Sequence, residues 1–265
     1  MVDAVLELVV APALVGAATL AARRWGQRVG GLVSAFPAIV GPVLLVAALQ
    51  HGPAFAARAA NGTLLGLVAL AGFALVYALV AHRTGWRASL ALGWAAAGAL
   101  GLAVGAVAAG APVGLLAAAA SLALAHRLLP GIAAGALHAE PGVPRWDLPL
   151  RMALTALLAV SLTAAASRLG PVVAGVLAAL PVLASILAAF THARYGASAV
   201  VELLHGMLGG MAGFVCFCAL VAALVEPAGI AAAFAVSAVA ALAVQAATAR
   251  AQPSCGALAA AQSDA

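Results

Sequence analysis

The sequence predicts an all-α integral membrane protein made of two similar halves. Hydrophobic residues form 66% of the 265-residue chain and charged residues only 7%, whereas ordinary soluble domains are about half apolar and a quarter charged. Several uncharged apolar runs reach the roughly 20 residues that a helix needs to cross a bilayer. Helices are the expected spanning structure, because an open sheet cannot satisfy its backbone hydrogen bonds in lipid.

The two halves correspond to each other without gaps at a separation of 144 residues. The matched residues are mostly glycine and proline, which fix backbone shape rather than chemistry. The matched pairs are Arg24 and Arg168, Gly26 and Gly170, Gly31 and Gly175, Pro37 and Pro181, Gly52 and Gly196, Gly62 and Gly206, Gly66 and Gly210, and Phe73 and Phe217. The chain is therefore expected to contain two copies of one unit, the usual framework of a transporter whose site lies between the copies.

Nine helical spans are expected along the chain. The apolar segment 88–129 carries only Arg127 and is too long for one span, so we divide it at the turn-forming sequence Gly110-Ala111-Pro112. The segment 130–149 contains four prolines and several charged residues, which is typical of a solvated linker. The expected spans are 3–22, 29–49, 61–81, 88–109, 112–129, 150–167, 172–191, 201–224 and 228–249.

These spans group into four regions. The first membrane repeat covers 1–109 and the second covers 150–250. A linking helix and a cytoplasmic linker occupy 110–149, and a disordered tail is expected over 251–265. Each repeat has four spans, and the fifth span has no counterpart in the other repeat.

The arginines orient the predicted spans. With nine spans, ten of the twelve arginines fall on one face of the membrane, and only Arg58 and Arg168 fall on the other. Cytoplasmic loops are enriched in basic residues, so the ten mark the cytoplasm. The N-terminus is then outside and the C-terminus inside. An odd number of crossings separates the copies, which predicts an inverted-topology repeat with its pseudo-two-fold axis in the membrane plane.

The first copy resembles the GlpM-like small membrane proteins. The resemblance is carried by Gly30-Gly31-Leu32, by Phe36-Pro37, by the polar bend at Gly52 and by the glycine-containing apolar span to Tyr77. It covers roughly residues 1–105 and, more weakly, 150–250, so the chain looks like a fused tandem form of a four-span unit. The resemblance implies a bacterial inner-membrane location and a transport role, without a substrate or catalytic residues.

Prolines interrupt the second and seventh spans. Pro37 and Pro42 lie within one span and Pro181 within the other. A proline inside a helix removes a hydrogen bond and kinks the helix, and in lipid the freed carbonyls must face protein or a cavity. Discontinuous helices at matching positions indicate a binding site; a kink that only improves packing is the alternative. The candidate substrate-binding residues are Ser34, Pro37, Gly41, Pro181, Ser185, Asn61 and His205.

Charged residues suggest proton coupling or ion pairing. Glu202 and His205 are three residues apart and share a helix face, so they could form a proton relay, since histidine titrates near neutral pH. Alternatively, Glu202 is a solvated charge in the first turn of a helix. In the repeat register, Glu7 matches Arg151 and Arg58 matches Glu202. That exchange of signs suggests two ion pairs, Glu7–Arg58 and Arg151–Glu202.

The expected function is secondary transport or export of a small solute, coupled to protons through Glu202 and His205. The chain has no Walker loop, G-x-S-x-G, H-E-x-x-H or Cys/His cluster, so we expect no enzyme activity, no cofactor and no metal. The bilayer and an unidentified small molecule are the expected partners, and the scattered arginines indicate topology rather than nucleic acid. Few charges lie within the spans, which favours a neutral, zwitterionic or lipid-like solute. A channel and a non-transporting scaffold are the alternatives, and the oligomeric state is open.

Overall fold

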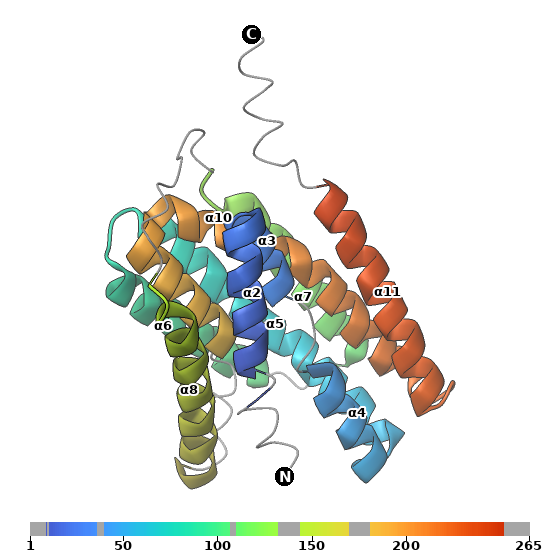
Figure 1. Ribbon diagram of the computed structural model, residues 1–265. Helices are drawn as coiled ribbons and strands as arrows, with labels where there is room; N and C mark the ends of the chain where they lie inside the picture. Colours follow the sequence, from blue (N-terminus) through green and yellow to red (C-terminus); the bar gives the residue numbers. More distant parts are fainter. Residues whose placement is uncertain are drawn as a thin grey trace.

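The computed structural model describes residue 9 and the ranges 11–35, 40–106, 110–131, 144–169 and 181–251. These ranges are helical apart from short turns and contain no strand (Figure 1), which confirms the all-α class. The helices are α2 (Ala11–Trp25), α3 (Gln27–Ser34), α4 (Val40–His51), α5 (Pro53–Ala81), α6 (Trp86–Gly105), α7 (Ala111–Leu128), α8 (Asp147–Leu169), α10 (Val182–Leu224) and α11 (Ile230–Ala251).

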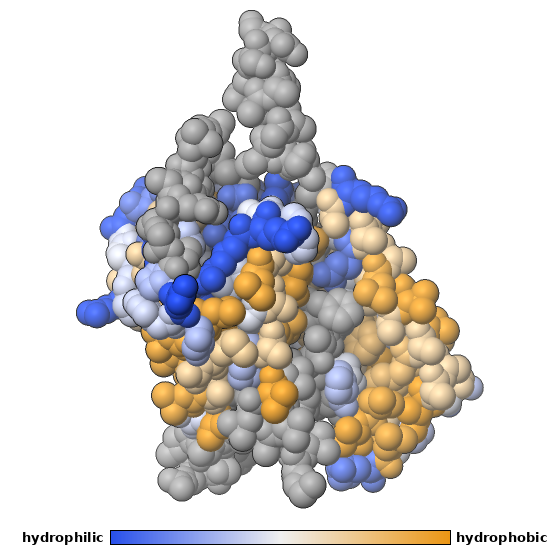
Figure 2. Space-filling model, in the orientation of Figure 1, coloured by the Kyte–Doolittle hydropathy of each residue, from blue (hydrophilic) through white to orange (hydrophobic). Residues whose placement is uncertain are grey.

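The outer surface is that of a membrane protein. Four helices, α5, α6, α10 and α11, are long and apolar enough to cross a bilayer. Large apolar side chains such as Leu116 and Val239 are exposed, and extensive exposed apolar surface marks contact with lipid or protein rather than with water. In Figure 2 apolar residues cover the sides of the molecule, and many of the hydrophilic residues gather towards its upper end.

Two glycines bend the chain in the same way at matched positions. Gly52 separates α4 from α5 with φ 86° and ψ 169°. Gly196 interrupts α10 with φ 83° and ψ −176°, so α10 consists of a first part, 182–195, and a second part, 197–224. A positive φ is strained for residues that carry a Cβ atom, and glycine adopts it freely. The polar bend expected at Gly52 and the matched position Gly196 are therefore both glycine hinges.

One helix start recurs at the separation seen in the sequence. α6 begins at Trp86 and α11 begins at Ile230, 144 residues later. The matched segments therefore share a helix start as well as glycines.

The expected second span is two helices. α3 ends at Ser34, Ala35 lies in a turn, and α4 begins the next described stretch at Val40; the predicted break at Pro37 lies outside the described residues. In the second copy the described chain resumes at Pro181, which is the N-cap residue of α10. The expected third span, 61–81, was too short at its start, because α5 begins at Pro53, directly after the glycine hinge.

The long helices α5 and α10 pack against each other at the centre, and the other helices surround them. α6 packs on α5, α11 packs on α10, and α2 packs on α3 and α8. The short helix α3 crosses the second part of α10 so closely that a Cβ atom on Gly31 would meet the Leu203 carbonyl, and one on Gly206 would meet the Arg28 carbonyl. A helix of the first copy is thus seated on a helix of the second.

Candidate functional site

The serines at the breaks hold the backbone. The Ser34 hydroxyl donates to the Gly31 carbonyl at 2.6 Å. The Ser185 hydroxyl donates to the Pro181 carbonyl at 2.7 Å and accepts from the Trp94 indole nitrogen at 2.7 Å. These bonds match the alternative in which the two hydroxyls cap a broken helix. Both hydroxyls already donate to backbone carbonyls.

The carbonyl ends of α3 also find a partner. The Gln245 amide nitrogen, on α11, donates to the Leu32 carbonyl at 2.7 Å. In lipid an unpaired carbonyl costs several kcal/mol, so this bond from a sequence-distant helix stabilises the end of α3. The sequence offered no signal for it beyond a lone glutamine within an apolar helix.

The other candidate residues are dispersed. Gly41 lies beside Phe217, and the Asn61 side chain lies beside Gly114 of α7. His205 is half-buried, its Nδ1 atom lies 3.0 Å from the Val201 carbonyl, and its ring centroid lies 5.8 Å from that of His126. Arg58 is exposed and Glu202 is half-buried. The structure does not gather these residues around one point.

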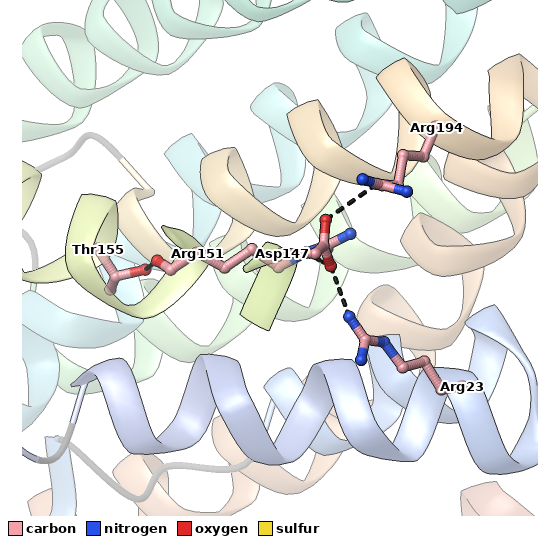
Figure 3. Close-up of polar contacts among 5 residues, drawn as sticks. All are labelled: Arg23, Asp147, Arg151, Thr155 and Arg194. Carbon is pink, nitrogen blue, oxygen red and sulfur yellow. Dashed lines mark hydrogen bonds and ion pairs between the residues drawn. The ribbon is translucent and has the colours of Figure 1, made fainter. Parts of the chain in front are cut away.

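A different group of charges does converge. The Asp147 carboxylate accepts from Arg23 Nη2 at 2.6 Å, from Arg151 Nε at 3.0 Å and from Arg194 Nε at 3.0 Å (Figure 3). We call these four residues the Asp147 cluster. They come from the end of α2, the start of α8 and the end of the first part of α10. Both copies and the linker therefore contribute to it.

The Asp147 cluster is buried. The Asp147 side chain is 0% exposed and that of Arg151 is 3% exposed. The Arg151 guanidinium lies 4.8 Å from the ring centroid of Phe190. The Arg194 guanidinium lies 5.5 Å from the ring centroid of Trp146. Burial by itself raises the pKa of Asp147, but the Arg151 charge, the hydrogen bonds from Arg151 and Arg23 and the Arg194 charge outweigh it and hold that pKa below its usual value. The carboxylate is therefore ionised at neutral pH.

The cluster changes two sequence-based expectations. Asp147 was assigned to a solvated linker, but it begins α8 and is buried, because three guanidiniums compensate its desolvation. Arg151 was paired with Glu202 by repeat register, but its partner among the described residues is Asp147, four residues earlier on the same helix. Glu7 lies outside the described residues. The signal that could have found this pair is the i, i+4 spacing of an acid and a base at a helix start.

Two cavities flank the first part of α10. A polar cavity of about 10 Å³ is lined by Thr19, Ala22, Arg23, Gln27, Arg151, Leu187, Thr191, Tyr195 and Leu203. An apolar cavity of about 360 Å³ is lined by Trp86, Leu90, Trp94, Leu154, Leu158, Ser185, Ile186, Ala189, Phe190 and Ala193. Each cavity takes its walls from both copies, so both lie at the seam between them.

The fold and the site together define an all-α membrane protein with two cavities whose walls come from helices far apart in the sequence. No family model, curated protein or solved structure matches the chain. The function is therefore argued from the geometry alone.

Proposed function

We propose that this protein is a secondary transporter of a small solute, with nine spans in two inverted four-helix repeats and a linking helix, α7. It resides in the bacterial inner membrane with its N-terminus outside and its C-terminus in the cytoplasm, in keeping with the resemblance to GlpM-like proteins. The main support for the proposal is that the two cavities lie at the boundary between the copies. Both cavities lie next to a discontinuous helix of the kind that forms transporter sites.

The matched helices α2 and α8 support the inversion. Arg23, near the end of α2, pairs with Asp147 at the start of α8, and Gly16, nearer the middle of α2, lies beside Met152 further along α8. Residue numbers fall on one helix as they rise on the other, so the two helices run antiparallel. Two copies whose corresponding helices run in opposite directions are expected in an inverted repeat.

Alternating access would use the glycine hinges. Gly52 and Gly196 allow α4 and the first part of α10 to change angle against the long helices that follow them. Rocking of one copy against the other would open the seam to each side in turn. The polar cavity, at about 10 Å³, has room for about one water-sized group in this conformation.

Proton coupling through Glu202 and His205 is part of the same proposal. The two residues lie on the second part of α10, three residues apart, and a second histidine ring, that of His126 on α7, faces His205. Ionisable residues inside a membrane are costly and usually have a functional role.

Accessibility of a buried seam residue tests the transport proposal. We expect a single cysteine at Leu187, in a variant whose Cys216, Cys218 and Cys255 are replaced by serine, to react with a membrane-impermeant maleimide from either side of the membrane. Leu187 lines the polar cavity and is 2% exposed, so reaction requires opening. The measurement compares labelling in right-side-out and inside-out vesicles.

A matched cysteine at Val239, which is exposed midway along α11, should react from neither aqueous side. Reaction of the Leu187 cysteine from one side only, or from neither, would contradict alternating access and favour a scaffold role.

A further inference from the structure

The polar cavity at the seam carries an excess of positive charge. Arg23 and Arg151 line it, and Arg194 joins them on Asp147. Within the described part of the chain, Asp147 is the only carboxylate paired with these three guanidiniums. One negative and three positive charges leave two positive charges uncompensated at this point. Arg151 is 3% exposed, whereas Arg23 and Arg194 are 28% and 19% exposed and keep part of their hydration. The excess positive charge would attract an anion into the cavity.

The Thr19 hydroxyl points to a missing group. Most other helical serine and threonine hydroxyls that the structure describes with a bond donate to a carbonyl three or four residues earlier, as in Ser34, Thr63, Ser121, Thr155, Ser185, Ser237 and Thr248. Thr19 is 3% exposed, lines the cavity, and its Oγ1 atom has no hydrogen-bond partner. Buried hydroxyls without a partner are rare in folded proteins.

A second donor is unpaired beside it. The Nε atom of Arg23 is also buried and without a partner, although Nη2 of the same guanidinium bonds Asp147. Arg23 follows Thr19 by four residues, so both side chains lie on one face of α2. The two residues that carry these unpaired donors therefore line the same cavity, next to the net positive charge of the Asp147 cluster.

We propose that this cavity binds a single small anionic group, the size of a halide ion or of one carboxylate. The inference rests on the proposed function, because it identifies the transported solute or its co-ion as an anion, in place of the neutral or zwitterionic solute expected from composition. A volume of about 10 Å³ holds about one water-sized group, so a halide ion or the oxygen end of a carboxylate is the largest anionic group that could enter without displacing the lining side chains. Water would satisfy the Thr19 hydroxyl and Arg23 Nε but not the charge, and a cation would meet repulsion from the arginines.

Anion titration of the thermal unfolding midpoint tests this site. The purified full-length protein in detergent is transferred to gluconate buffer, whose anion is too large for the cavity, and chloride, bromide or formate is added at constant ionic strength. We expect a saturable rise in the midpoint, because a ligand of the folded state stabilises it in proportion to its occupancy.

Substitution of Thr19 provides the matched comparison. Thr19→Val keeps the shape and removes the hydroxyl, and should raise the half-saturating anion concentration about tenfold, equivalent to about 1.4 kcal/mol. Thr63→Val removes a hydroxyl that bonds the Ala59 carbonyl on α5 and should leave that concentration within about twofold. Arg194→Gln, which lowers the excess charge without altering the cavity lining, should also weaken binding.

The titration distinguishes two kinds of anionic ligand, an organic carboxylate and an inorganic ion. Saturation by formate and not by the halides identifies the carboxylate group of an organic anion, and saturation by the halides identifies an inorganic ion. A linear response equal to that of gluconate, or saturation unchanged in Thr19→Val, would overturn the proposal. The anion titration is made in detergent and requires no transport. A failure to bind anions would therefore not affect the Leu187 labelling result, and a failure of the labelling would not affect the titration.

Discussion

Replacing Asp147 with asparagine is expected to destabilise the protein so strongly that only a small fraction folds. Asparagine keeps the size of the side chain but removes the only negative charge that the described residues place among Arg23, Arg151 and Arg194. Arg151 is 3% exposed and cannot move into water without unpacking α8. Breaking a buried ion pair by removing one partner typically costs about 3–5 kcal/mol, a large part of the stability of most proteins.

The measurement for Asp147→Asn is the monodisperse fraction and the unfolding midpoint after extraction in mild detergent. Glu226→Gln is the control, because Glu226 is exposed after α10 and its loss should change neither quantity. The double variant Asp147→Asn with Arg151→Gln should recover part of the loss, since the two residues interact directly. An Asp147→Asn variant as stable as the parent would show that the cluster does not hold α2, α8 and α10 together.

Alanine at Gly31 is expected to separate the two copies where α3 crosses α10. A Cβ atom at this position would meet the Leu203 carbonyl and the Met207 amide nitrogen. Backbone atoms cannot rotate out of the way as a side chain can, so α3 must move away from α10. Overpacking of a core costs about 1–3 kcal/mol and sometimes more, and Gly206→Ala should have a similar effect, because its Cβ atom would meet the Arg28 carbonyl.

The unfolding midpoint of Gly31→Ala and Gly206→Ala is compared with that of Gly105→Ala. Gly105 lies near the exposed end of α6, and no atom comes within 4 Å of a Cβ placed there. Alanine at Gly105 should be neutral or slightly stabilising, because alanine favours a helix more than glycine does. Equal midpoints for Gly31→Ala and Gly105→Ala would mean that the close crossing of α3 and α10 is not needed for the fold.

The local backbone features could be predicted from the sequence, because they depend on residue types at single positions. Gly52 was recognised as a bend and Gly196 as its match, and both adopt a positive φ that glycine adopts freely. The interruption of the second span was predicted from its prolines. The common separation of 144 residues also relates the helix starts at Trp86 and Ile230.

The Asp147 cluster could not be predicted, because it depends on contacts between distant segments. Arg23 and Asp147 are 124 residues apart in the chain, and no local pattern relates them. A repeat register compares equivalent positions in the two copies, whereas Arg151 pairs with a residue of its own helix. Thr19 carried no signal at all, since its importance comes only from the hydrogen bond it lacks.

The membrane orientation of the two chain ends tests most directly the inverted duplication on which the transport proposal depends. Nine spans place the N-terminus outside and the C-terminus in the cytoplasm, so a fluorescent reporter active only in the cytoplasm should work at the C-terminus alone. A phosphatase reporter active only outside should work at the N-terminus alone. Both ends on the same side of the membrane would require an even number of spans and would contradict the inverted repeat.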